Sequence, residues 1–415
     1  MRRKYDHAKL SQSACLLEGL CICLMRTDGN FAVIIHSYPD CANVIPKGML
    51  GQLPGRFFCT NLRESDVMSG TTMDRLQECV KLVAEVENPD AVYVFGSCLS
   101  ELIGDDIESV AAAAAGELST TVIAVTSSGL DDTSQKRVID RHAELMYCAA
   151  RTGPGTQKPL TVNLIGLPYD DGEIEEILAE AGIGVNVHLN EKSRMSDWIK
   201  LLSGALNVVL DKELYSNLTG RMKAEHGTPL IEVPIPAGVK GTDSFFLKIA
   251  AHFKRKSQMK SVIEEKRKEA FEAVARKKAD WKGLKLAYNI GTDRNYIPHI
   301  TARNGLCEVD FFRELGFDVT LLIQGSPEPD RVLFISRLLD EMKITADFDI
   351  FVDNVSMTPA LKKKNYNLVY CVGAMAEMVR PTQVPMIALG SLRTGYNGCL
   401  YNLGLIEKTL EGRHD

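Results

Sequence analysis

Residues 91–110 read AVYVFGSCLSELIGDDIESV, and this stretch contains the pattern that decides the fold. Its first part, Ala91–Phe95, is a short run of apolar, β-branched and aromatic residues that is typical of a strand. Gly96 and Ser97 then mark a turn, and the residues after Cys98 have a helical composition. A strand that ends in a tight turn and leads into a helix is the unit from which parallel α/β sheets are built.

Similar runs recur from one end of the chain to the other and alternate with helical segments. This alternation predicts an α/β protein with parallel sheets. The predicted strands are residues 31–36, 91–95, 121–125, 160–165, 185–189, 208–210, 285–288, 319–323, 350–352, 368–371 and 386–388.

The length of the chain, 415 residues, exceeds what one compact core accommodates, and about 100 to 200 residues per domain predicts two or three domains. A Gly/Pro/Thr segment at 151–159 has the composition of a domain boundary. We predict three Rossmann-like domains, at 1–155, 156–282 and 283–415.

The second predicted domain ends in a charged stretch at about 244–282, for which we predict one long helix. Opposite charges there often lie three or four positions apart, which is the spacing that supports an exposed helix. We interpret it as a solvated connector, with a docking face for an acidic partner as the alternative.

The composition excludes several classes of protein. The hydrophobic fraction of 45% and the charged fraction of 25% are those of an ordinary soluble globular protein. A formal net charge of −6 argues against a nucleic-acid partner. Glu18 interrupts the apolar run near the start, and no run reaches the roughly 20 residues needed to cross a bilayer. We therefore expect a cytoplasmic protein with no membrane partner.

Nucleotide-binding signatures are missing from the sequence. The P-loop pattern does not occur, and Gly182-Ile183-Gly184 lacks the third glycine of a dinucleotide fingerprint and precedes a predicted strand. Rossmann-like topology therefore does not imply a bound nucleotide here.

The eleven cysteines are unevenly spread, and seven of them precede residue 99. A secreted disulfide framework would be shorter and denser. Cys41 and Cys98 each follow a predicted strand, and ligands collect at the carboxyl ends of parallel strands, so we predict that these two converge while the segment with Cys15 folds across them. Three thiolates suit an iron–sulfur cluster or zinc. For any single one, a buried packing role is the alternative.

Three motifs extend this interpretation. Cys98 leads into Ile103-Gly104-Asp105-Asp106, residues 36–41 read HSYPDC, and residues 58–70 read FCTNLRESDVMSG. Asp105 and Asp106 near a helix start are interpreted as caps rather than as catalytic groups.

Over about residues 10–115, these motifs resemble component 1 of nitrogenase and its relatives. The matching family features are a cysteine followed by Ile-Gly-Asp-Asp, a His-Gly-Pro-x-Gly-Cys turn and a Glu-x-Asp-x-x-x-Gly segment. Ser37 and Asp40 replace the two glycines of the family turn, so we expect a rearranged backbone there, with Asp40 as a further group near the metal in an alternative interpretation.

The resemblance implies a nitrogenase component 1-like fold in which Cys15, Cys41 and Cys98 are the metal ligands of an interfacial iron–sulfur cluster of [4Fe-4S] or [8Fe-7S] type. It also implies two partners: a homologous subunit or second copy across a two-fold interface, and a separate iron protein that binds ATP and delivers low-potential electrons. Cys21, Cys23 and Cys59 are interpreted as packing residues. A zinc site is disfavoured because no Cys-x-x-Cys pair occurs.

Nitrogenase itself anchors its active-site cofactor through a cysteine of the second domain and a histidine of the third, and those positions fall at Asp211 and near Gly390 here. The resemblance therefore implies an oxidoreductase that acts on a small molecule other than dinitrogen, with a tetrapyrrole as the family-level candidate. Catalytic residues remain unknown. The groups that position alone suggests for an interdomain cleft are His299, Arg303, Arg393 and Tyr396, and a structural role is the alternative for each.

Two other functions remain open from the sequence. One is a scaffold that assembles a metal cofactor and passes it on, because scaffold relatives share the fold and the cysteines. The other is a non-redox α/β binding protein with incidental thiols.

Overall fold

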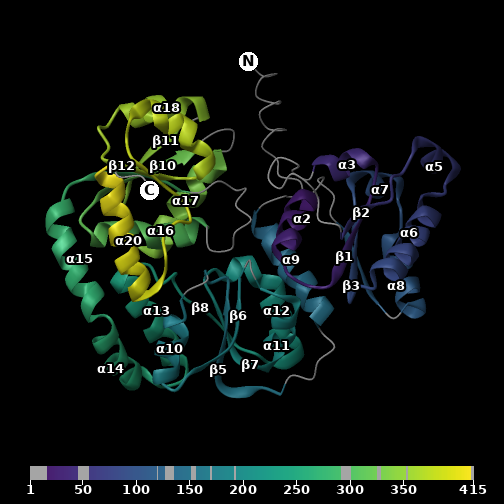
Figure 1. Ribbon diagram of the computed structural model, residues 1–415, viewed down its shortest axis with the longest axis horizontal. Helices are drawn as coiled ribbons and strands as arrows, with labels where there is room; N and C mark the ends of the chain where they lie inside the picture. Colours follow the sequence, from purple (N-terminus) through teal and green to yellow (C-terminus); the bar gives the residue numbers. More distant parts are fainter. Residues whose placement is uncertain are drawn as a thin grey trace.

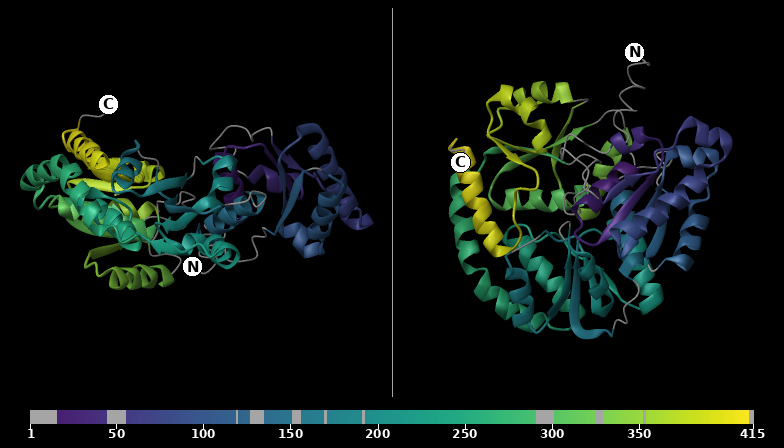
Figure 2. Two further views of the ribbon diagram at one scale, coloured as in Figure 1. Left: turned by 90° about the horizontal axis from the view of Figure 1, so that it is seen from below. Right: turned by 45° about the vertical axis from the view of Figure 1, so that its right-hand side comes forward.

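The computed structural model describes residues 16–44, 56–118, 120–126, 135–150, 156–168, 171–190, 193–290, 301–324, 329–351 and 354–412. Within these residues the strands form three sheets, and every pair of neighbouring strands is parallel. Helices cover the sheets in three lobes, and the first and third lobes lie on either side of the second (Figures 1 and 2). The predicted α/β class with three parallel sheets is confirmed.

The first lobe is built on a four-stranded sheet with the order β2-β1-β3-β4. Residues of one strand alternate between two cores: in β1, Phe31, Val33 and Ile35 pack beneath α2 and α9, whereas Ala32 and Ile34 pack beneath α6 and α8. A strand buried on both faces is what a parallel sheet requires. The elements of this lobe are α2 (Leu16–Arg26), β1 (Phe31–His36), α3 (Pro39–Val44), β2 (Phe57–Cys59), α5 (Glu64–Ser69), α6 (Thr72–Glu87), β3 (Ala91–Gly96), α7 (Cys98–Ile103), α8 (Ile107–Glu117), β4 (Thr121–Thr126) and α9 (Gln135–Ala150).

The second lobe repeats this strand order, as β6-β5-β7-β8. Helix α9 joins it to the first lobe, because Asp140 of α9 accepts hydrogen bonds of 2.8 Å from both the Ser216 hydroxyl and the Asn217 N–H at the start of α12. The elements of this lobe are β5 (Lys158–Ile165), α10 (Glu173–Glu180), β6 (Gly184–Leu189), α11 (Met195–Lys200), η1 (Leu201–Ser203), β7 (Gly204–Val209), η2 (Lys212–Tyr215), α12 (Ser216–His226), β8 (Leu230–Glu232), α13 (Gly238–His252), α14 (Lys256–Lys266) and α15 (Lys268–Trp281).

The third lobe has a five-stranded sheet with the order β11-β10-β9-β12-β13. One continuous apolar core joins it to the second lobe. At their junction, Glu173 at the start of α10 accepts the backbone N–H of Asn397 at 3.1 Å, and the N–H of Gly395 donates to the carbonyl of Pro236 at 2.9 Å. The elements of this lobe are β9 (Lys285–Asn289), α16 (Ala302–Glu314), β10 (Asp318–Gln324), α17 (Pro329–Met342), β11 (Asp347–Phe351), α18 (Asn354–Lys362), β12 (Leu368–Cys371), η3 (Gly373–Met375), α19 (Ala376–Val379), η4 (Arg380–Thr382), β13 (Met386–Ala388) and α20 (Gly395–Leu410).

The single long helix predicted at 244–282 is wrong, because the stretch is divided among α13, α14 and α15. Lys254, with φ at 57°, turns the chain between the first two. The turn lets α14 pack on α10 and α15 on α20 along one edge of the molecule (Figure 1). Met259 and Trp281 are buried in these contacts, so the two helices pack against the second and third lobes and are not a solvated connector.

Among the helices that the structure describes, none has both the length and the apolar character that a membrane span requires.

Candidate functional site

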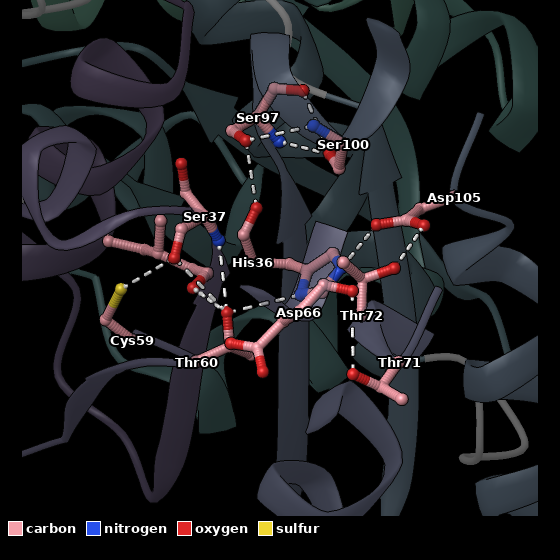
Figure 3. Close-up of polar contacts among 11 residues, drawn as sticks. His36, Ser37, Cys59, Thr60, Asp66, Thr71, Thr72, Ser97, Ser100 and Asp105 are labelled. Atoms are coloured by element: carbon pink, nitrogen blue, oxygen red, sulfur yellow. Dashed lines mark hydrogen bonds and ion pairs between the residues drawn. The ribbon is translucent and has the colours of Figure 1, made fainter. Parts of the chain in front are cut away.

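The candidate site lies at the carboxyl edge of the first sheet, where β1 and β3 end side by side with His36 opposite Gly96. In the order β2-β1-β3-β4, the chain adds β2 on one side of β1 and then β3 on the other. The carboxyl ends of β1 and β3 therefore form a topological switch point. Such switch points are where open α/β sheets bind their ligands. Figure 3 shows the polar contacts here, and the residues that it labels all belong to the first lobe.

His36 is the centre of this network and is completely buried. Its Nε2 lies 2.9 Å from a carboxylate oxygen of Asp105, and its Nδ1 lies 3.2 Å from the Thr60 hydroxyl (Figure 3). Burial lowers the pKa of His36, and hydrogen bonding and charge from Asp105 oppose that shift. A neutral imidazole fits both contacts: Nε2–H donates to the carboxylate, which only accepts, and Nδ1 accepts from Thr60.

Asp105 and Asp106 have different roles, although they are adjacent in the sequence. Asp106 caps α8, since its carboxylate accepts the N–H of Ser109 at 3.0 Å. Asp105 binds His36 and also accepts the hydroxyl of Thr72 at 2.7 Å. The capping prediction is therefore confirmed for Asp106 and wrong for Asp105, which holds His36 in place.

Two serines fix the turn that carries Cys98. The Ser97 hydroxyl donates to the carbonyl of His36 at 2.9 Å, which joins the ends of β1 and β3. The Ser97 N–H donates to the Ser100 hydroxyl at 2.8 Å in a capping box that starts α7 at Cys98. Gly96 leaves space for this arrangement, because a Cβ there would lie 3.2 Å from the Ser100 hydroxyl oxygen.

The predicted ligands Cys41 and Cys98 are both partly exposed, and neither is in a disulfide. Cys41 lies in α3 after β1, and Cys98 begins α7 after β3. The structure thus places two of the three predicted ligands just after adjacent strand ends. Cys15, the third, lies outside the described residues, and within those residues no group of three His, Cys, Asp or Glu side chains is arranged to hold a metal ion.

The cysteines interpreted as packing residues differ from these two. Cys21 and Cys23 lie in α2 and are buried in the core. The thiol of Cys59 donates to the carbonyl of Ser37 at 3.5 Å (Figure 3). Burial raises the pKa of Cys59, and the nearby Cys41 adds to the rise. A thiol that is kept protonated and bonded to backbone is consistent with packing.

The site offers one group suited to a sulfur-rich ligand. Ser37 lies between His36 and Cys41, and its hydroxyl is buried with no hydrogen-bond partner among the described residues. A buried hydroxyl without a partner is unfavourable, and donors near metal-bound sulfur tune a cluster's properties. Partly exposed thiols after two adjacent strands, with a hydroxyl that can donate in the turn before Cys41, therefore fit a cluster.

A second polar region lies where the second and third lobes meet. Asp211 follows β7 and is buried, and its charge acts on Arg303 of α16. The guanidinium of Arg303 also lies 3.5 Å from Glu232 and 3.1 Å from Glu341. Acidic groups from both lobes thus balance the positive charge of Arg303. In the third lobe, the N–H of Gly390 donates to the hydroxyl of Tyr370 at 3.1 Å.

The other groups suggested for a cleft have separate positions. Tyr396 is buried, and its hydroxyl donates to Asp243 at 2.6 Å, which links α20 to α13. Arg393 is exposed and stacks on Tyr401, with the guanidinium carbon 3.7 Å from the ring centroid. His299 lies outside the described residues.

The sequence reasoning missed the buried network of His36, Asp105, Thr60 and Thr72. A signal for it was present, because His36, Thr60 and Asp105 all lie in or next to the three quoted motifs, each of which follows a strand.

Comparison with known proteins gives one family. The family model of nitrogenase component 1 type oxidoreductases matches residues 29–402. The nitrogenase iron-molybdenum cofactor biosynthesis protein NifE of Nostoc sp. is 28% identical over 54% of this chain and 48% of its own length. The protein of the same name from Rippkaea orientalis is 26% identical over 68% of this chain and 62% of its own.

The nitrogenase molybdenum-iron protein alpha chain of Methanothermobacter marburgensis is 27% identical over 50% of this chain and 45% of its own length. The chain thus spans about half to just under two thirds of these curated relatives. A solved structure of nitrogenase Cp1 at pH 6.5 superposes with a TM-score of 0.73 at 18% identity, and the match covers 96% of this chain and 89% of that chain. At this level of identity, the superposition shows that the two chains share a fold and nothing more.

Proposed function

Because the chain belongs to the family of nitrogenase component 1 type oxidoreductases, we propose that it is one subunit of an ATP-dependent reductase. In this proposal Cys15, Cys41 and Cys98 hold an iron–sulfur cluster that accepts low-potential electrons from a separate iron protein. The substrate is a small molecule other than dinitrogen.

The observation that carries the proposal is the pair of partly exposed cysteines after β1 and β3. The Ser97–His36 hydrogen bond joins the two strand ends, and the capping box fixes where Cys98 begins its helix. A thiolate-bound cluster supplies one-electron transfer, at a potential that burial and hydrogen bonds set. The part of this chain is to orient the thiols and to offer the Ser37 hydroxyl.

A partner subunit is the next part of the proposal. Leu102 lies one helical turn after Cys98 in α7 and is 73% exposed, so the face of α7 that carries Cys98 also carries an exposed apolar side chain. Exposed apolar side chains are frequent at interaction sites, and three cysteines leave a four-iron cluster one ligand short. We propose that a homologous subunit or a second copy covers this face across a two-fold axis.

For the substrate, we propose the junction of the second and third lobes. The residues at the family's cofactor anchors, Asp211 and Gly390, offer neither a thiol nor an imidazole, which supports a substrate other than dinitrogen. Asp211, Glu232 and Arg303 can bind polar groups there, and a tetrapyrrole is the family-level candidate.

The test is anaerobic purification with the natural partner, followed by iron and sulfide analysis and electron paramagnetic resonance. Cys15→Ala, Cys41→Ala and Cys98→Ala are expected to abolish the cluster signal. Cys79→Ala is the matched control: Cys79 lies in α6 of the same lobe, and burial raises its thiol pKa to about 11, so its loss is expected to leave the iron content unchanged. Iron-free wild type would contradict the proposal and favour a non-redox binding protein.

A scaffold for cofactor assembly is the second candidate, and it is favoured by the relatives named as cofactor biosynthesis proteins. The two functions differ in turnover. With reduced iron protein and ATP, a reductase forms product over many cycles, whereas a scaffold releases one cluster or cofactor per chain to an acceptor protein.

A further inference from the structure

Arg393 lies in the segment that joins β13 to α20, where the third lobe meets the second. Two residues further on, the N–H of Gly395 donates to the carbonyl of Pro236 in the second lobe, and α20 begins beside α13 of that lobe (Figure 1). Arg393 is exposed, so a ligand can reach it without any opening of the core.

The first turns of α20 fix the backbone of Arg393. The buried side chain of Asn402 accepts the Arg393 N–H at 2.8 Å and donates to the Arg393 carbonyl at 2.8 Å. Gly398 lets the two segments approach this closely, because a Cβ at that position would lie 2.7 Å from the carbonyl carbon of Arg393. The side chain of Arg393 therefore leaves the backbone at a fixed point.

The side chain of Arg393 is also held in place. Its guanidinium carbon lies 3.7 Å from the centroid of the Tyr401 ring, and Tyr401 is itself 43% exposed. At this distance the guanidinium stacks on one face of the ring, which leaves the N–H groups at its edge free to donate. A group that is ordered before binding loses less conformational entropy when a ligand arrives.

The positive charge of Arg393 has no carboxylate within ion-pair distance among the residues that the structure describes, and its guanidinium donates no hydrogen bond to them. Other arginines near this junction differ. Arg267 is paired with Asp243 at 2.7 Å, and Arg303 is paired with Glu341 at 3.1 Å. In a chain of net charge −6, an ordered arginine without a carboxylate is suited to an anion from outside the chain.

The contacts at the start of α20 favour a carboxylate over a phosphate. Phosphates are commonly bound by backbone N–H groups at a helix start. Here the N–H of Gly395 is bonded to a backbone carbonyl, and the N–H of Asn397 is bonded to the carboxylate of Glu173. The guanidinium edge of Arg393 remains, where two parallel N–H groups match the two oxygens of one carboxylate.

We propose that Arg393 binds a carboxylate group of an organic ligand at the junction of the second and third lobes, and that Tyr401 holds the guanidinium in place for this contact. The identification of this ligand with the substrate of the reductase rests on the proposed function, whereas the binding of a carboxylate does not.

The test is fluorine NMR relaxation of three probes, each added to the full-length protein purified anaerobically with its partner. The probes are para-fluorobenzoate, its neutral methyl ester and para-fluorophenyl phosphate. We expect para-fluorobenzoate to bind more tightly than the other two. Absence of binding by para-fluorobenzoate, or equal or tighter binding of the ester or the phosphate, would overturn the proposal.

Arg393→Gln and Arg337→Gln form a matched pair, because Arg337 is an exposed arginine in α17 of the same lobe. We expect Arg393→Gln to weaken the binding of para-fluorobenzoate by about tenfold or more, as the loss of a charge-assisted hydrogen-bonded pair predicts. Arg337→Gln should leave the affinity unchanged. Equal affinities in the two variants would refute the assignment to Arg393.

Substitutions of Tyr401 test the role of its ring. Tyr401→Phe keeps an aromatic face and should keep the affinity, whereas Tyr401→Ala frees the guanidinium and should weaken binding several-fold although the charge is retained. Both positions are exposed, so the variants are expected to fold. Equal affinities for the two Tyr401 variants would contradict the role of the ring. These measurements need no turnover, so a failed reductase assay and a failed carboxylate site give separate results.

Discussion

Alanine substitution at Asp105 and at Asp106 distinguishes the roles of two adjacent aspartates that look alike in the sequence. Asp105→Ala removes the acceptor for both His36 Nε2 and the Thr72 hydroxyl. His36 and Thr72 are both buried, and a buried polar group left without its partner costs about 1–3 kcal/mol. Two such groups, with some relaxation, give an expected loss of about 3 kcal/mol in the free energy of unfolding. Asp106→Ala removes only an exposed helix cap, so we expect a clearly smaller loss.

The assay is urea unfolding of both variants under anaerobic conditions, with iron content measured on the same samples. Asp105→Ala is also expected to lower the iron content, because His36 directly precedes Ser37 in the turn that leads to Cys41, whereas Asp106→Ala retains it. Asp105→Asn serves as a further control, since its amide oxygen still accepts from Thr72. Equal losses of stability for the two alanine variants would refute the assignment of Asp105 to His36.

Three further predictions follow from buried or inter-lobe groups. Glu308 has a folded pKa of about 7 against an ordinary value of 4.5, so the folded state binds more protons between these values. Relative to Glu308→Gln, the free energy of unfolding of the wild type should therefore fall by about 3 kcal/mol as the pH rises from about 4.5 through 7. Urea unfolding at several pH values measures this, and parallel pH profiles for the two proteins would contradict it. Glu173→Ala should increase amide hydrogen exchange in the first turn of α20, because Asn397 loses its acceptor, whereas Glu175→Ala on the exposed face of α10 should not. Tyr396→Phe should lower the free energy of unfolding by about 1–3 kcal/mol, because the hydrogen bond to Asp243 is lost, and it should leave turnover unchanged. A loss of turnover without a loss of stability would instead place Tyr396 in the substrate site.

The central strands were predictable from the sequence, and two edge strands were not. Phe31–His36 and Ala91–Gly96 are fully buried, so their apolar character is continuous and visible. Strands β2 and β8 have three residues each and lie at sheet edges. An edge strand pairs on one side only, and three residues show little periodicity. Strand β13 is equally short and also at an edge, and its prediction rested on composition alone.

The helix prediction at 244–282 failed for a different reason. The charge pattern reports which residues face solvent, and it continues through Lys254, where the backbone leaves the helical region. What decides the break is the packing of α14 on α10 and of α15 on α20. These contacts join residues far apart in the chain, which no local pattern records.

The candidate site also has a part that local sequence predicts and a part that long-range packing decides. The topology rule puts Cys41 and Cys98 after two adjacent strands, because it needs only the order of the strands in the sheet. The bond between His36 and Asp105 spans 69 positions, and it depends on how α6 and α7 return to the sheet. Asp105 and Asp106 are indistinguishable in sequence, and a single residue of register decides which one turns inward.

The three sheets share one design that explains how chemistry changes on this fold. Within each sheet the strand interiors are apolar, whereas polar groups collect at or after strand ends: His36 and Ser97 in the first lobe, Asp211 in the second and Gly390 in the third. A side chain beyond a strand end can be exchanged without disturbing either face of the sheet. His36 is the exception, because it ends β1 and is buried against Asp105. Glu308 departs from this design because it lies inside the core, where exchange is costly. That departure makes the core of the third lobe, unlike its strand ends, sensitive to pH, because the pKa of Glu308 is raised to about 7.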